Sequence, residues 1–284
     1  MFEGFQASRS ADGIALWVGG SGPPLLLLHG YPQTHAMWHA VAPSLTQTFT
    51  VVLADLPGYG DSEPPAVEAH HSPHSKRVWA RRLVTAMAEL GFQTFSVCGH
   101  DRGARVAYRM ALDHPQRVQR LAVLDIVPTA EMYDRADRFF GFGYWHWFFL
   151  IQPAPFPETM IGHDPDGFFE GSLMKMTTFD PGALEAYRAA WRRPATVQAI
   201  CEDYRAGFGI DSDLDRADRA AGRTITAPLL VLWATYGAIG VWYDPLALWG
   251  QWADDVSGRA VDATHFLAED RPDEVAQLLV DFFG

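Results

Sequence analysis

Short apolar segments alternate with longer segments of helical periodicity along the first half of the chain. The apolar segments are bounded by turn residues, which is typical of buried strands, and they occupy residues 25–28, 50–54, 95–98 and 121–124. Apolar residues recur at helical spacing within residues 75–90 and 104–113. This alternation predicts an α/β fold in which helices cover both faces of a mostly parallel sheet.

The alternation stops after residue 127 and resumes after residue 221. The residues between contain helical and aromatic-rich segments, interrupted by proline and glycine, without a comparable strand pattern. Two further strands and a closing amphipathic helix are expected at 228–233, 260–261 and 273–283. We interpret the chain as an α/β core of residues 1–127 and 222–284, interrupted by a helical cap domain of residues 128–221.

Charge and cysteine content narrow the classes of partner. The 284 residues include 22 basic and 34 acidic side chains, a formal net charge of −12, which disfavours nucleic acid and anionic membranes as partners. Two cysteines are too few for a disulfide framework. No signal-peptide pattern begins the chain, and the longest apolar segment, 139–151, is too short to span a bilayer. We therefore expect a cytoplasmic protein without a membrane partner.

A strand-to-helix turn at residues 97–103 carries the first candidate for chemistry. Gly99 and Gly103 permit a tight turn that raises one side chain above the sheet, and that side chain is Asp101. The N-terminus of the following helix favours an ionised carboxylate at this position. Asp101 is therefore a candidate nucleophile, although a helix cap is the commoner role for aspartate at such a place.

Two other segments carry candidate partners for Asp101. The sequence His-Gly-Tyr-Pro at 29–32 follows a predicted strand, so the backbone N–H groups of Tyr31 and Arg102 could form an oxyanion hole. His265 follows the last short strand, in the chain order nucleophile and then histidine. We expect His265 to act as a general base, although a lone histidine is more often structural.

These motifs resemble the α/β-hydrolase superfamily, in the branch whose nucleophile is aspartate. The matching segments are His-Gly-Tyr-Pro at 29–32, Gly-His-Asp-Arg-Gly at 99–103 and Thr-His-Phe-Leu at 264–267, and the similarity extends over nearly the whole chain. The branch contains haloalkane dehalogenases, haloacetate dehalogenases and epoxide hydrolases. The resemblance implies an eight-stranded, mostly parallel sheet with a helical cap, and a homodimer.

Arginines next to Asp101 favour the haloacetate (fluoroacetate) dehalogenases within this branch. Arg102 and Arg105 are three positions apart and therefore share a helix face, and a guanidinium group matches a carboxylate with paired hydrogen bonds. In the resembling family, arginines at these positions bind the substrate carboxylate. The alternative is that one or both form surface ion pairs.

The resemblance also implies the acid that orients His265 and the groups that bind the halide. Asp125 ends the strand from which the family takes its acid; Asp244 is the reserve, because 233–238 contain no carboxylate. His146 and Trp147 match the family's halide donors, and Tyr204 is the choice for the third, although aromatic clusters are usually core.

The predicted activity is hydrolysis of a short 2-haloacid, a small anionic substrate, through an aspartyl ester. The nearest alternative is an epoxide hydrolase that uses Tyr144, Tyr187 or Tyr204 to protonate the epoxide, and a second alternative is a non-catalytic protein that binds small acids. No metal or organic cofactor is expected, and the histidines near residue 70 are interpreted as a solvated loop. Tyr236 departs from the family pattern and is expected to crowd the pocket.

Overall fold

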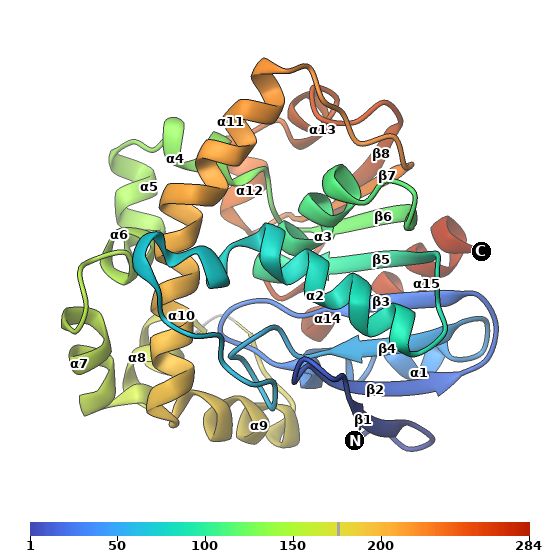
Figure 1. Ribbon diagram of the computed structural model, residues 1–284, viewed down its shortest axis with the longest axis horizontal. Coiled ribbons are helices and arrows are strands. Elements are labelled where there is room, and N and C mark those ends of the chain that lie inside the picture. Colours follow the sequence, from blue (N-terminus) through green and yellow to red (C-terminus); the bar gives the residue numbers. More distant parts are fainter. Residues whose placement is uncertain (175–176) are drawn as a thin grey trace.

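A single mixed sheet forms the centre of the computed structural model, which describes residues 1–174 and 177–284 (Figure 1). Within these residues, eight strands lie in the order β1-β2-β4-β3-β5-β6-β7-β8. Their bounds are Gln6–Arg9 (β1), Ala15–Gly20 (β2), Pro24–Leu28 (β3), Thr50–Ala54 (β4), Phe95–His100 (β5), Val118–Leu124 (β6), Leu229–Ala234 (β7) and Val256–Val261 (β8). Strand β2 pairs antiparallel with β1 and β4, and the other pairs are parallel. The predicted fold class is confirmed.

Six of these strands were expected from apolar runs, and β1 and β2 were not. Every residue of β1 is exposed, because this strand forms the edge of the sheet and has no core face. Strand β2 mixes buried and half-exposed positions. By contrast, β5 is buried along its whole length, as expected for a central parallel strand.

Helices cover both faces of the sheet. Helices α2 (Lys76–Glu89) and α3 (Asp101–Asp113) pack against each other on one face, and α1 (Ala42–Leu45) and α15 (Pro272–Phe283) contact each other on the other face (Figure 1). Helix α14 (Leu267–Asp270) precedes α15. Among the described helices, none has the length and apolarity needed to cross a membrane.

Helices alone connect β6 to β7 in the part of the chain that the structure describes. Their bounds are Thr129–Asp134 (α4), Arg138–Gly143 (α5), Trp145–Leu150 (α6), Phe156–His163 (α7), Pro165–Leu173 (α8), Pro181–Trp191 (α9), Pro194–Ala206 (α10) and Ser212–Ala220 (α11). A π-helical turn, Gly207–Asp211, joins α10 to α11. These helices lie at the carboxyl ends of the parallel strands (Figure 1). After β7, α12 (Ala238–Trp242) and α13 (Pro245–Trp249) complete the fold.

The turn between β5 and α3 is closed by contacts that only glycine allows. Asp101 adopts a left-handed backbone conformation with φ of 42°. A Cβ atom on Gly103 would lie 2.3 Å from the carbonyl oxygen of His29, and one on Gly99 would lie 2.5 Å from the carbonyl oxygen of Gly103. Strands β3 and β5 can therefore approach the start of α3 this closely only without side chains at the two positions.

We predict that Gly103→Ala lowers stability, because the added methyl group meets backbone that cannot move without disturbing β3. The expected cost is about 1–3 kcal/mol or more. Urea unfolding measures it. The matched control is Gly162→Ala in α7, where nothing apart from the backbone of its own helix lies within 4 Å of the new Cβ, and stability should stay equal or rise slightly. Equal stability of the two variants would show that the turn tolerates a side chain.

Candidate active site

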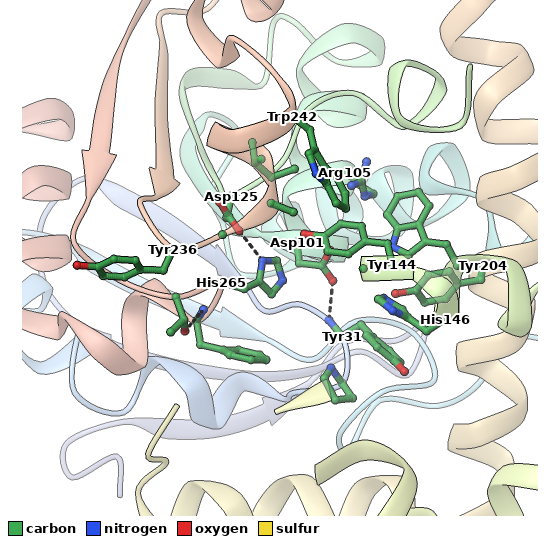
Figure 2. Close-up of a pocket in the computed structure, with 18 residues that line it drawn as sticks. Tyr31, Asp101, Arg105, Asp125, Tyr144, His146, Tyr204, Tyr236, Trp242 and His265 are labelled. Atoms are coloured by element: carbon green, nitrogen blue, oxygen red, sulfur yellow. Dashed lines mark hydrogen bonds and ion pairs between the residues drawn. The ribbon is translucent and has the colours of Figure 1, made fainter. Parts of the chain in front are cut away.

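A cavity of about 380 Å³ lies between the carboxyl ends of the strands and the helices that connect β6 to β7 (Figure 2). Groups from the sheet side, from the connecting helices and from α12 line it. The sheet side contributes Tyr31, Asp101, Arg105, Asp125, His265 and Phe266. The segment between β6 and β7 contributes Tyr144, His146, Trp147 and Tyr204, and α12 contributes Ile239 and Trp242. Segments far apart in the sequence therefore meet at one place.

The carboxylate of Asp101 projects into this cavity from the start of α3 (Figure 2). The backbone N–H of Tyr31 donates a hydrogen bond of 3.0 Å to its Oδ2 atom. Burial by itself raises the pKa of Asp101, but the positive charges of His265, Arg105 and Arg102 outweigh burial and hold the pKa below its ordinary value. The side chain is therefore an ionised carboxylate at neutral pH.

His265 lies between Asp101 and Asp125 (Figure 2). Its Nδ1–H donates to Oδ2 of Asp125 at 2.6 Å, which leaves Nε2 as the atom that can accept a proton. Asp125 follows β6 directly, and its Oδ1 accepts from the N–H of Ala234 at 2.9 Å. Burial lowers the pKa of His265, yet the hydrogen bond and charge of Asp125 raise it above 6.5.

The reserve acid, Asp244, lies elsewhere. Its side chain caps α13 by accepting a hydrogen bond of 3.0 Å from the N–H of Ala247. The structure thus brings Asp125, and not Asp244, to His265. The two positions were separable in the sequence because only Asp125 ends a strand beside the turn at Asp101.

His100 is a supporting residue that the sequence analysis missed. It is fully buried directly before Asp101, and its Nε2–H donates to the carbonyl oxygen of His265 at 2.8 Å. Burial and the neighbouring His265 lower the pKa of His100 to about 3, so the ring stays neutral. The hydrogen bond therefore holds the loop of His265 against the turn of Asp101.

The two arginines occupy different environments. Arg105 lines the cavity, and its Nη1 donates to the carbonyl oxygen of Val127 at 3.0 Å. Arg102 is not among the described residues that line the cavity; its guanidinium group is fully buried, donates to Asp203 and lies 4.2 Å over the ring of Tyr204. Both guanidinium groups were expected on one cavity wall, but only that of Arg105 lies there. The guanidinium group of Arg102 is instead hydrogen-bonded to Asp203.

Aromatic rings that carry N–H and O–H groups form the wall contributed by α6 and α10. The ring of His146 stacks on Tyr31 with centroids 5.7 Å apart, and Tyr204 meets Tyr31 edge-on at 5.2 Å. Trp147 meets Tyr204 edge-on at 5.8 Å. Burial lowers the pKa of His146 to about 3, so its ring is neutral at physiological pH. The three predicted halide donors are therefore neighbours on one wall.

The remaining tyrosines fall into two groups. Tyr144 lines the cavity, whereas Tyr187 donates its hydroxyl hydrogen bond to Glu269 and receives one from Gln33. Tyr236 lines the cavity, but the residue is 64% exposed and its ring points away from Asp101, so the ring does not crowd the space next to the nucleophile (Figure 2).

No group of histidine, cysteine or carboxylate side chains that could hold a metal ion occurs among the described residues. His71, from the histidine-rich segment, instead contacts Glu202, with 2.6 Å between its Nδ1 and Oε2. The sequence did not predict a role for Trp242, which lines the cavity from α12. A single aromatic residue in a short helix after β7 does not by itself indicate a binding site.

Comparison with known proteins gives consistent matches over the whole chain. Residues 23–272 match the family model of the alpha/beta hydrolase fold. Fluoroacetate dehalogenase from Burkholderia sp is 45% identical over 292 residues, covering 100% of this chain and 95% of that protein. The solved structure of a putative alpha/beta hydrolase from Nostoc sp PCC 7120 is 49% identical, with a TM-score of 0.96 and 99% of each chain covered. A putative epoxide hydrolase from Pseudomonas aeruginosa is 44% identical, with a TM-score of 0.94, covering 99% of this chain and 96% of that one.

The contact between Asp125 and His265 predicts the titration of the imidazole. His265 should titrate above 6.5, because the adjacent carboxylate stabilises the protonated ring. Asp125→Asn removes that charge and should move the midpoint to lower pH, measured from the imidazole NMR signals. Asp244→Asn is the control and should leave the midpoint unchanged. A midpoint insensitive to Asp125→Asn would contradict the assigned cause.

Proposed function

The chain belongs to the α/β-hydrolase family and, within it, to the haloacetate dehalogenases, and on that basis we propose that it hydrolyses a short 2-haloacid to the hydroxy acid and halide. It is a hydrolase that acts on carbon–halide bonds. The observation that carries the proposal is an ionised carboxylate, Asp101, facing both His265 and Arg105 across one cavity. A carboxylate nucleophile suits an alkyl carbon, because the resulting ester can be cleaved at its own carbonyl group.

In the first step, Asp101 attacks the carbon that bears the halogen. A carbon–oxygen bond forms, the carbon–halogen bond breaks, and its electron pair leaves with the halide. His146, Trp147 and Tyr204 would stabilise the departing ion, since their N–H and O–H groups are donors on stiff rings of the cavity wall. The low pKa of Asp101 keeps the nucleophile ionised for this attack.

In the second step, Nε2 of His265 takes a proton from water, and the resulting hydroxide attacks the carboxyl carbon of the Asp101 ester. The N–H groups of Tyr31 and Arg102 would stabilise the tetrahedral oxyanion, as the N–H of Tyr31 already bonds Oδ2 of Asp101. Collapse breaks the bond between the Asp101 carboxyl carbon and the ester oxygen, the hydroxyl proton of the intermediate passes to that oxygen, and the hydroxy acid leaves. His265 releases its proton to solvent, and Asp101 is again an ionised carboxylate. Ester formation removes the charge of Asp101, which is one cause of the raised pKa of His265, so the imidazole becomes more readily neutral when a base is required.

Two unpaired donors support a carboxylate substrate. Nε of Arg105 and Nη1 of Arg102 are buried without a hydrogen-bond partner among the described residues. A buried donor that has no partner costs free energy, about 1–3 kcal/mol or more when charged, and an anion in reach would recover it. We assign the substrate carboxylate to these two arginines, with Arg105 the one that lines the cavity.

Epoxide hydrolysis is the second candidate function. Tyr144 and Tyr204 both line the cavity and could donate to an epoxide oxygen. A neutral epoxide would leave the arginine donors unpaired, which favours the haloacid. A non-catalytic protein that binds small acids would need neither Asp125 nor its contact with His265.

Three further features belong to this proposal. Residues 128–221 would form a cap domain over the nucleophile, since helices from this segment supply one cavity wall. A homodimer would cover exposed aromatic residues such as Phe139 and Phe142 on α5. A cytoplasmic location fits two buried, unpaired cysteines, and the substrate is the proposed partner, with no nucleic acid or membrane.

Halide release tests the reaction class. The protein should release fluoride from fluoroacetate or chloride from chloroacetate, and it should do so far faster than it forms diol from styrene oxide. Ion-selective electrodes and chromatography measure the two products. Diol without halide would establish the epoxide hydrolase instead, and neither product would leave the binding protein.

Covalent catalysis is tested by blocking the second step. His265→Asn lacks the base for ester hydrolysis, so incubation with chloroacetate should add the mass of one carboxymethyl group to the peptide that contains Asp101. Peptide mass spectrometry detects the adduct, and Asp101→Asn in the same background should abolish it. An unmodified peptide from a folded variant that still binds chloroacetate would exclude the ester.

A further inference from the structure

Asp203, on α10, is the centre of a fully buried ionic cluster behind the cavity wall. Its carboxylate accepts hydrogen bonds from Nε and Nη2 of Arg102 at 2.9 and 2.6 Å, from the hydroxyl of Tyr59 at 2.8 Å, and from Nζ of Lys76. Each of these side chains is at most 2% exposed. Three separate segments of the α/β core therefore meet one side chain of α10.

The cluster leaves Arg102 one free pair of donors. Nη2 also donates to the backbone carbonyl oxygen of Asp203 at 3.0 Å, so Nε and Nη2 are both engaged. Nη1 has no partner among the described residues. Gly207 makes room for this arrangement, because a Cβ atom there would lie 3.1 Å from Nη2. The guanidinium group is thus held in one orientation, with Nη1 as its remaining donor.

The cluster contains a second carboxyl group, Asp211. The charges of Arg102 and Lys76 lower the pKa of Asp203 more than burial raises it, so Asp203 is ionised. Asp211 accepts from the backbone N–H of Lys76 at 2.8 Å, and its Oδ2 lies 3.5 Å from Nζ of Lys76. Lys76 therefore has two carboxyl partners, whereas the buried Nη1 of Arg102 has none among the described residues, which favours an anion near Nη1.

We propose that Asp203 is a positioning residue for the substrate: it fixes the Arg102 guanidinium so that Nη1 can hold the carboxylate of the haloacid. This inference rests on the proposed dehalogenase function. It assigns to Asp203 no contact with substrate, and its effect passes through Arg102. A purely structural role would consist of joining α10 to the core, and the two roles differ in what they do to substrate preference.

The test compares chloroacetate with chloroacetamide, which has the same reacting carbon and leaving group but no negative charge. Asp203→Asn keeps the shape of the side chain and removes the charge that orients Arg102. The ratio of kcat/KM for chloroacetate to kcat/KM for chloroacetamide, measured by chloride release, should fall about 10- to 100-fold, the value of one charge-assisted hydrogen bond.

The control variant removes a matched buried ion pair that involves the same helix, α3. Asp215 of α11 pairs with Arg109 of α3 at 2.8 Å, and both are at most 2% exposed, but neither lines the cavity in the part of the chain that the structure describes. Asp215→Asn should lower the melting temperature and leave the substrate ratio unchanged. Both variants lose an ion pair between α3 and the helices that connect β6 to β7, so only the orientation of Arg102 separates them.

A wild-type enzyme that is active on chloroacetate, together with an unchanged ratio in Asp203→Asn, overturns the role of Asp203 alone. A wild-type protein that releases no chloride from chloroacetate overturns the proposed function and this inference with it. If Asp203→Asn does not fold, Tyr59→Phe removes one donor to the same carboxylate. The ratio should then fall about two- to fivefold, a fraction of one hydrogen bond, and an unchanged ratio in this folded variant is equally decisive against the proposal.

Discussion

The close approach of strand β3 to the first turn of α3 is the constraint on which the site depends. Gly30, Gly99 and Gly103 are packed so tightly that a Cβ atom on Gly30 would lie 2.6 Å from Cβ of Asp101. This packing over-determines the backbone of Asp101, whose positive φ would otherwise cost about 1–3 kcal/mol. In return, the carboxylate stands at a helix N-terminus, beside the N–H of Tyr31 and within the field of His265. Moving the turn would separate all of these groups at once.

Burial of charge is offset by pairing throughout the site. Asp101, Asp125 and His265 share one chain of opposite charges and hydrogen bonds, and Arg102 is paired with Asp203. Asp101, Asp125 and Arg102 are buried away from water, so their interactions are stronger than they would be at the surface. The same exclusion makes any unpaired donor costly, which is why the free nitrogens of Arg102 and Arg105 are informative about what enters the cavity.

Local patterns predict the parts of this molecule that are locally determined. The central strands and the turn at Asp101 were readable because apolar runs and paired glycines act over a few residues. The exposed edge strand β1 was not predicted, because it contains no apolar run. The sequence also did not predict the partner of Arg102, because Asp203 lies 101 positions away and only tertiary packing brings the two side chains together. The ring of Tyr236 turns outward for the same kind of reason, since backbone direction after β7 decides it.

The net charge of −12 affects both the entry of substrate into the cavity and the release of products from it. An anionic substrate approaches a surface of the same sign, and the attraction of the buried arginines is felt only at short range, within about 10 Å at ordinary ionic strength. Arrival is therefore slowed by the long-range field. Each turnover, however, converts one anion into two, the hydroxy acid and the halide, and the field that opposes arrival drives both of them outward. An acidic surface around a small cationic centre thus lowers the rate at which substrate arrives and raises the rate at which products leave.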